Sequence, residues 1–506
     1  MLKYLLDRPL LFCSIVCAAV AYLGYYSIYF AVSVGICAVI LCLLILKFKK
    51  HTAYILCCVL VCILSVTTLF EALKADKYKT FSATDEQAAL TLCELNEQNE
   101  YFSGVFQIIK SKNIQTGIKV YAFFEPCEIQ VGDRITAKIK VYPTKEKYRL
   151  SNFSEGVYLT ANIYNINKIG EDALLKTVEK VKGYIKLTLF TNLERDEAAT
   201  VSALLFGEKA YFDMAYETAV RRAGVSHVMV VSGMHLSISV LFFVGLFSRI
   251  WYNRYVKAIT MLMVVLILTS VCGFSISILR AGVTFVIAAV LLLLNRNSLS
   301  ENNLGGAVTI LLIFNPLIVF NGAFWLSVLS TFGILCVARY VLSRLEHTRI
   351  CANTLVFAVA SSAVITLAAT LMTLPLTIYL FGEISIVGVV TNLLISYPVT
   401  LIIWLSLLGV LASLVLPIFS KFIFILTEPL VAFVNGVIMY FGNLSFASVA
   451  VPKETAFLVL AVIVAVFWAL LYFKQRKYCK QLKLKGIKTE KETKKSKKQE
   501  GFIVNS

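Results

Sequence analysis

Half of the histidines in this chain lie in one short polar stretch, residues 221–239, which reads RRAGVSHVMVVSGMHLSIS. It places His227, Ser232, Gly233 and His235 where a charged amphipathic segment gives way to an apolar run. Ser232 and His235 are three residues apart, so on a helix they share one face and can present hydrogen-bond donors to one ligand. The alternative is a helix whose histidines only hydrogen-bond to neighbouring groups. Because polar groups at the mouth of a membrane span are costly unless they face protein or water, these four residues are a candidate functional site.

Two kinds of catalytic site are disfavoured by the residues of this stretch. A nucleophile elbow needs Gly on both sides of the Ser in a strand–turn–helix, and Val231 stands before Ser232. A hydrolytic metal centre needs several His and carboxylate ligands at close spacing. The histidines of the chain form no such cluster; they are His51, His227, His235 and His347. We therefore expect no catalytic residue, no metal ion and no cofactor.

The composition is that of a membrane protein. Of 506 residues, 58% are hydrophobic and 15% are charged, and the mean hydropathy is +0.79. Soluble proteins are nearer half apolar and a quarter charged. Apolar runs long enough to cross a bilayer recur along the chain. We expect a polytopic α-helical membrane protein of about twelve spans, in residues 10–47 (two spans), 52–73, 227–249, 257–273, 276–294, 304–320, 322–342, 351–380, 386–414, 421–441 and 455–473.

The net charge of +18 is unevenly distributed. Residues 474–506 hold twelve basic and three acidic residues, a net charge of +9. Such a tail is typical of a segment that lies on the anionic lipids of the cytoplasmic leaflet, and it need not bind nucleic acid. The other Lys- and Arg-containing loops alternate along the predicted spans, so the positive-inside rule predicts both termini in the cytoplasm.

Residues 74–170 have a soluble character and are predicted to lie outside the cytoplasm. Residues 133–142 read DRITAKIKVY, in which apolar residues alternate with Thr and Lys as in a half-buried strand. Four or five such strands in about 75 residues predict a small extracytoplasmic β-barrel, for which the OB-fold is one candidate. OB-folds bind single strands through stacking aromatic residues and a basic groove, and residues 110–149 carry nine basic and four acidic residues. A barrel with an ordinary solvated surface is the alternative.

Three further predictions concern the outer part of the chain. Residues 85–95 are predicted to form a short helix. Cys93 and Cys127 are the two cysteines of the outer segment, and an oxidising exterior permits a disulfide between them. Sequence alone does not show that the geometry allows this bridge. Residues 171–226 mix apolar and charged residues at helical spacing, which predicts amphipathic helices at the outer membrane interface.

Several predicted spans contain polar or helix-breaking residues. Arg280 stands in the apolar run CGFSISILRAG, and three later runs contain proline. Interrupted helices at membrane depth are tolerated where they are buried in protein or line a cavity. An intramembrane Arg is costly unless water, a carboxylate or a phosphate solvates it. This pattern favours a translocation path past Arg280; the alternative is that Arg280 pairs with Glu208 or Glu383 and only holds helices together.

Four pieces of the sequence, in order, resemble the ComEC-type competence channel family. They are GEKAYFDMAYETAVRRAGVSHVMVVSGMHLSISV, CGFSISILRAGV, NPLIVFNGAFWLSVLSTFGI and TLMTLPLTIYLFGEISIVGVVTNLLISYPV. The first piece contains the family's signature of histidine, a short apolar stretch, Val-Ser-Gly, one residue and histidine. The outer barrel matches the OB-like domain of the family in position and length. The resemblance covers about residues 10 to 475 of the chain.

The resemblance implies a set of residues along a DNA path. Trp325 and Ser327 lie where the family usually has Phe-Gln-Leu-Ser, and Glu208 lies where it usually has Asp after Gly. These departures leave the chemistry at Trp325 and Glu208 open. The implied path and signature residues are His227, Ser232, Gly233, His235, Arg280, Trp325 and Ser327.

The resemblance also implies a function and partners. Family members pass one strand of incoming DNA across the bacterial cytoplasmic membrane during natural transformation. The expected partners are single-stranded DNA and membrane lipids, with a DNA receptor, a cytoplasmic helicase-like ATPase, a separate nuclease and a second copy of the chain as a homodimer. Many members continue into a metallo-β-lactamase-like domain, whereas here a Lys-rich tail follows the last predicted span, so we expect no enzyme activity. A transporter of a small solute is the alternative function.

The chain is therefore predicted to divide into five segments. They are residues 1–73 (N-terminal transmembrane helices), 74–170 (OB-like β domain), 171–226 (amphipathic interfacial helices), 227–473 (competence-type channel domain) and 474–506 (basic cytoplasmic tail).

Overall fold

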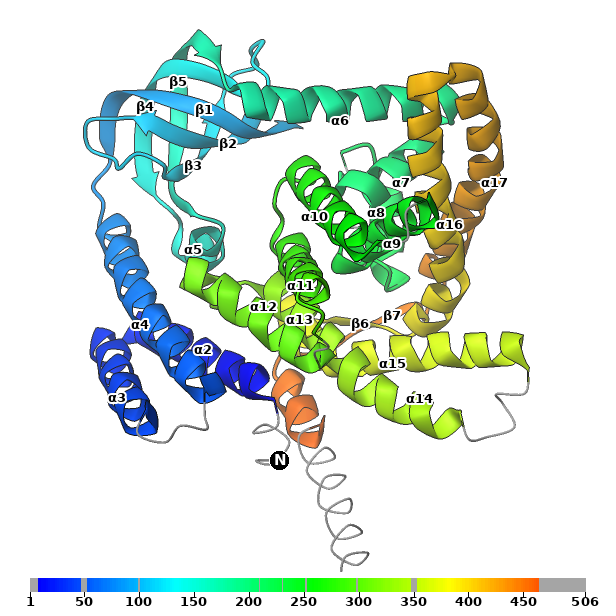
Figure 1. Cartoon of the computed structure of the whole chain (residues 1–506). Helices are drawn as coiled ribbons and strands as arrows, with labels where there is room; N and C mark the ends of the chain where they lie inside the picture. The colour runs from blue at the N-terminus through cyan, green and yellow to red at the C-terminus, as the bar shows by residue number, and fades with distance from the viewer. Residues whose placement is uncertain are drawn as a thin grey trace, which may run out of the picture.

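The computed structural model consists of many helices and one small barrel (Figure 1). It describes residues 8–46, 52–98, 101–208, 210–229, 231–250, 253–296, 299–346 and 353–463. Within these residues, eight helices are long and apolar enough to cross a membrane, and two shorter apolar helices accompany them. The predicted class, a polytopic helical membrane protein, is confirmed. The count of about twelve spans stays a prediction.

Among the described residues, three helices precede the barrel: α2 (Pro9–Tyr26), α3 (Ile28–Leu46) and α4 (Thr52–Lys79). Pro9 suits the first position of α2, because its missing N–H would have no partner there. Cys17 of α2 and Leu64 of α4 are buried in one apolar cluster with residues of α12 (Ser300–Phe314). Tyr78, at the end of α4, is buried in the barrel core. The barrel is therefore packed directly onto the last turn of a membrane helix.

Five strands close the barrel in the order β1-β2-β3-β5-β4. They are β1 (Thr84–Gln98), β2 (Tyr101–Lys110), β3 (Lys119–Phe124), β4 (Asp133–Pro143) and β5 (Val157–Glu171), with α5 (Glu146–Ser154) between β4 and β5. β1 pairs antiparallel with both β2 and β4, and β3 pairs in parallel with β5. Phe106, Ile135 and Leu159 are fully buried in the interior. Closure leaves no long free edge for pairing with another chain.

The predicted helix at residues 85–95 is wrong, because this segment lies inside strand β1. Its sequence, DEQAALTLCEL, is rich in residues that favour helices. Ala88, Leu90 and Leu92 nevertheless recur at every second position, and all three are buried in the barrel. Glu86 is also buried, and its carboxylate accepts hydrogen bonds from the turn between β2 and β3. Pairing with neighbouring strands has overridden the local helix propensity.

Three helices lead from the barrel to the later membrane helices: α6 (Ala173–Asn192), α7 (Arg195–Phe206) and α8 (Met214–Arg222). The side chain of Asp172 caps α6 by accepting hydrogen bonds from two backbone N–H groups of its first turn. α7 ends at Gly207, whose φ of 77° is a left-handed conformation that glycine adopts without strain. In Figure 1, α6 runs from the barrel across to α16 (Gly388–Val415) and α17 (Pro417–Gly442).

Further helices follow in the later part of the chain. They are α9 (Gly233–Ile250), α10 (Arg254–Val271), α11 (Ile276–Leu293), α13 (Gly322–Gly333), α14 (Arg339–Leu345) and α15 (Thr354–Phe381), with a 3₁₀ turn η1 (Pro316–Phe320) and a π turn η2 (Ile334–Ala338). Two short strands, β6 (Glu383–Ser385) and β7 (Ser448–Ala450), pair with each other. Internal prolines lie in α15, α16 and α17, at Pro375, Pro398 and Pro429. Each removes one backbone donor from its helix.

An ionic cluster joins the barrel to the start of α6. The Asp133 side chain is 1% exposed, and its carboxylate lies 2.9 Å from the Nζ atoms of both Lys168 and Lys176. It also accepts a hydrogen bond from the backbone N–H of Gln130 at 2.8 Å. Burial raises the pKa of Asp133, but the Gln130 hydrogen bond and the two lysines outweigh it and hold this pKa below its usual range. The junction therefore depends on an ionised Asp133.

We predict that Asp133→Asn removes part of the acid sensitivity of the protein. A carboxyl group whose pKa is lowered by folding stabilises the fold above its unfolded pKa of about 4, and this contribution is lost as the pH falls through the lowered folded pKa. The thermal unfolding midpoint of the purified full chain, followed from about pH 7 to about pH 3, should therefore fall more for the native chain than for Asp133→Asn. Asp85→Asn, which removes an exposed carboxylate of the same barrel, should behave as the native chain does. Equal falls in all three proteins would contradict the prediction.

Candidate functional site

The start of α9 is capped by the polar residues of the signature stretch. Ser232 precedes the first residue of α9, and its Oγ accepts a hydrogen bond from the backbone N–H of Met234 at 3.2 Å. In return, Nδ1 of His235 accepts a hydrogen bond from the backbone N–H of Ser232 at 3.1 Å. This reciprocal arrangement is a capping box, with His in the position that Glu or Gln usually occupies. The first role of the Ser and the His is therefore to begin a helix.

The cap also fixes the tautomer of His235. Because Nδ1 accepts a hydrogen bond, the proton of the neutral ring resides on Nε2. His235 is 3% exposed, and its Nε2 has no hydrogen-bond partner among the described residues. A buried donor without a partner is uncommon in folded proteins. This N–H group is available to a water molecule or a ligand.

Arg280 of α11 lies against the start of α9. It is 7% exposed, and its Nε donates a hydrogen bond to Oγ of Ser327 on α13 at 2.8 Å. A Cβ built on Gly233 would lie 2.9 Å from a terminal nitrogen of Arg280 and 3.0 Å from the Cβ of Ala281. Only glycine leaves room for this approach. The structure thus brings together three of the predicted site residues, from three different helices.

The two carboxylates considered as partners of Arg280 are engaged elsewhere. Glu208 pairs with two lysines of α6, one of them Lys186 at 2.6 Å. Glu383 lies 3.5 Å from Arg221 and accepts a hydrogen bond from a serine of β7. Within the described residues, no carboxylate forms an ion pair with Arg280. The alternative of an acidic partner at Glu208 or Glu383 is therefore wrong, and a neutral hydroxyl takes that place.

Trp325 lies on the same helix as Ser327 but belongs to a different contact. Its Nε1 donates to the backbone carbonyl of Val319 at 2.7 Å. Its ring packs edge-on against Phe324, with the ring centroids 5.4 Å apart. The indole therefore ties α13 to η1, and no hydrogen bond or ring contact in the described part of the chain joins it to Arg280.

His227 lies in the turn between α8 and α9, where its side chain is exposed. The turn is held at Gly224, whose φ is 74° and whose Cβ, if present, would lie 2.7 Å from Cβ of Ser385. Ser385 Oγ donates to the carbonyl of Arg222 at 2.8 Å, and Arg222 donates to the carbonyl of Leu444 at 2.7 Å. The sequence did not identify Ser385 and Leu444 as partners of this turn. The available signal was the glycine itself.

Cys93 and Cys127 are both free thiols, so the structure contains no bridge between them. The Sγ atom of Cys93 donates to the carbonyl of Thr91 on its own strand at 3.7 Å. Cys127 packs against the barrel core instead. No three His, Cys, Asp or Glu residues gather as a metal site within the ranges that the structure describes.

The fold and this site define a polytopic membrane protein with an inserted barrel and a buried arginine at the junction of three helices. The competence protein family matches residues 204–476, which is more than half of the chain. The chain therefore belongs to the competence protein family, and the resemblance noted from the sequence is confirmed.

A curated relative matches part of the chain. The chain is similar to ComE operon protein 3 of Bacillus subtilis (strain 168), with 23% identity over 301 residues. The match covers 59% of this chain and 37% of that protein, so the chain spans little more than a third of its relative. No solved structure matches the chain.

We predict that the effects of Gly233→Ala and Ser327→Ala on stability are not additive. The new methyl group displaces the end of the Arg280 side chain, so the hydrogen bond to Ser327 is already weakened when Ser327→Ala is added. Ser327→Ala alone should lower the free energy of unfolding by about 1 to 3 kcal/mol. In the Gly233→Ala background the same change should lower it clearly less. The measurement is thermal unfolding in detergent.

The matched control for this cycle lies on the same helix. A Cβ at Gly245 meets nothing within 4 Å, so the cost of Gly245→Ala should simply add to that of Ser327→Ala. If Ser327→Ala destabilises the protein equally in the Gly233→Ala and Gly245→Ala backgrounds, Gly233 and Ser327 do not act through Arg280.

Proposed function

We propose that the chain is a membrane channel that passes single-stranded DNA into the cytoplasm during natural transformation. Membership of the competence protein family supports a role in DNA uptake. The observation that carries the proposal is the buried Arg280, which lies against the bare backbone of Gly233 and has no carboxylate partner among the described residues. A cation in apolar surroundings needs a counter-charge. A passing phosphate supplies one for as long as it stays.

The partners of Arg280 suit a transient contact. Ser327 accepts a hydrogen bond from one of the five N–H donors of the guanidinium group. Because its hydroxyl group is uncharged, the positive charge of Arg280 stays uncompensated. The fork of remaining donors matches the oxygens of a phosphate group. His235, two residues after Gly233, adds an uncharged donor on the same turn of α9. One charge and one neutral donor hold a phosphate loosely enough to release it.

The proposal also assigns a location to the barrel, to α6 to α8 and to the two termini. The closed barrel is an OB-fold on the outer face of the bacterial cytoplasmic membrane, and α6 to α8 lie at the outer interface. Both termini are cytoplasmic, and residues 227–473 form the channel domain. A DNA receptor, a helicase-like ATPase and a separate nuclease act with the channel, which works as a homodimer.

We expect Arg280→Ala to abolish DNA uptake while the protein still accumulates in the membrane. Arg280→Lys should restore uptake in part, because charge matters more here than the fork geometry. The measurement is transformation of competent cells, scored against protein level in isolated membranes. Loss of both variants from the membrane would make Arg280 a structural residue, and normal uptake by both would place the path elsewhere. Saturable uptake of a small solute with unchanged transformation would favour the transporter alternative.

The proposed orientation makes a separate prediction. The alternation of basic loops places the barrel outside and the basic tail inside. A reporter fused after Ser506 should therefore be active in the cytoplasm, and one inserted near Gly170 should be active outside. The opposite pattern of reporter activity would refute the orientation.

A further inference from the structure

Side chains on the outside of the barrel form rows that the strand register fixes. Phe123 of β3 lies opposite Asn162 of β5, and Asn162 lies opposite Lys140 of β4. Two residues further along β5, Tyr164 lies opposite Lys138 of β4. These side chains point outward, because the residues that alternate with them are buried in the barrel core. Two aromatic rings and two lysines therefore share one continuous face across three strands.

The side chains of this face are exposed and not neutralised. Phe123 is 44% exposed and Tyr164 is 48% exposed. Lys138 and Lys140 are exposed, and neither forms an ion pair with any described carboxylate. Elsewhere on β4, in contrast, Arg134 lies 3.0 Å from a carboxylate. The barrel thus leaves two lysines without an ion pair beside two exposed rings, and the amine of Lys140 lies 5.8 Å from the ring centroid of Tyr142.

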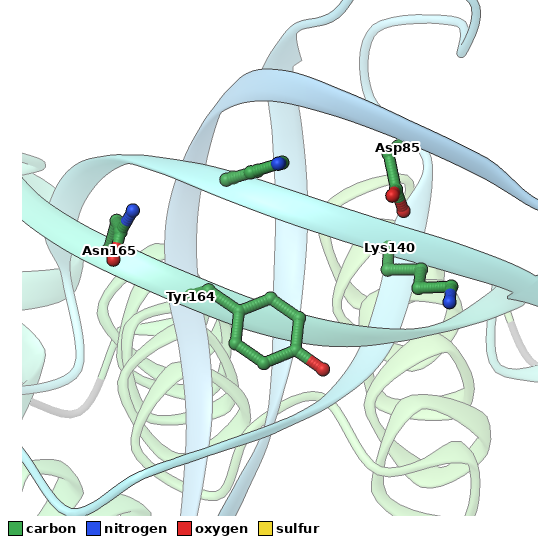
Figure 2. Close-up of a pocket in the computed structure, with 5 residues that line it drawn as sticks. Asp85, Lys140, Tyr164 and Asn165 are labelled. Carbon is green, nitrogen blue, oxygen red and sulfur yellow. The ribbon is translucent and has the colours of Figure 1, made fainter.

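A pocket opens in this face. It has a volume of about 240 Å³ and is lined by Asp85, Lys138, Lys140, Tyr164 and Asn165. Figure 2 shows the ring of Tyr164 and the amine of Lys140 projecting from neighbouring strands. The register between β4 and β5 shifts beside the pocket, and Asn165 has a φ of 51°, so β5 bends at this point.

We propose that this aromatic–lysine face, defined by Phe123, Tyr164, Lys138 and Lys140, binds the single strand before the strand reaches the membrane helices. The inference rests on the proposed function and adds the place where the strand is first held. Exposed rings stack with bases of any sequence, and free lysines attract the phosphate backbone. Phe123 and Tyr164 each take one base, while the backbone follows the lysines along β4.

One acidic residue sets the edge of the face. Asp85 of β1 lies opposite Lys140, on the side away from β5. Its carboxylate repels phosphate, so the strand runs along β4 and β5 and does not cross β1. Asp85→Asn should therefore strengthen binding, by about two- to fivefold for an exposed charge.

The test uses the full chain in detergent and a fluorescent oligo(dT) of about 16 nucleotides, with binding followed by anisotropy at several salt concentrations. Combining Phe123→Ala with Tyr164→Ala should weaken binding at least about tenfold, because stacking is lost at two bases. Combining Lys138→Gln with Lys140→Gln should reduce the slope of log K against log salt by about 1.4, since each phosphate contact to a single strand contributes about 0.7.

The controls carry changes of the same kinds at the start of α5 in the same domain. Tyr148 is 53% exposed, and Lys145 and Lys147 are exposed, so Tyr148→Ala and the two Lys→Gln changes should leave binding as it is. Equal loss in the control variants would overturn the location of the face. If an abasic oligomer binds as tightly as oligo(dT), the rings do not stack with bases. If the native chain does not bind oligo(dT) at all, the whole inference is refuted.

Arg280→Ala separates this inference from the channel proposal. Arg280 itself is proposed to contact phosphate, so Arg280→Ala should lose less oligo(dT) binding than either face variant does, and yet fail to import DNA. If the face variants keep full binding while Arg280→Ala loses uptake, the face is refuted and the channel proposal stands. If the face variants lose binding while Arg280→Ala imports DNA normally, the proposed path fails and the face stands.

Discussion

The guanidinium group of Arg280 fills the space where any residue larger than glycine at position 233 would place its side chain. This contact sets the start of α9 against α11, and the hydrogen bond to Ser327 adds α13. The capping box of Ser232 and His235 depends on the same helix start, because both of its hydrogen bonds require α9 to begin there. A short stretch of sequence therefore controls a helix terminus and the position of a buried charge together.

Features that depend on short-range pattern could be predicted from the sequence. Long apolar runs predicted the membrane helices, and strict alternation in residues 133–142 predicted strand β4. Residues 85–95 were mistaken for a helix because Glu, Gln, Ala and Leu dominate the segment. The alternation of Ala88, Leu90 and Leu92 decides the structure only when β2 and β4 pair on both sides of β1. Such pairing is a property of the whole barrel.

In the candidate site, too, the residues could be predicted from the sequence but their contacts could not. The sequence identified Gly233, Arg280 and Ser327 as residues of interest, and the structure places them together. Their contacts could not be predicted, because 47 residues separate Arg280 from Ser327 and nothing local relates the two helices. The alternative of an acidic partner for Arg280 failed for the same reason, since Glu208 and Glu383 bind other cations through the tertiary fold.

α6 holds the barrel at a fixed distance from the end of α7. α6 has 20 residues, which corresponds to about 30 Å of helix. Ion pairs join its first turn to the barrel at Asp133 and its middle to Glu208, just after α7. A helix held by ion pairs at two places behaves as a rigid rod and not as a flexible linker, so the barrel keeps a fixed position relative to the end of α7.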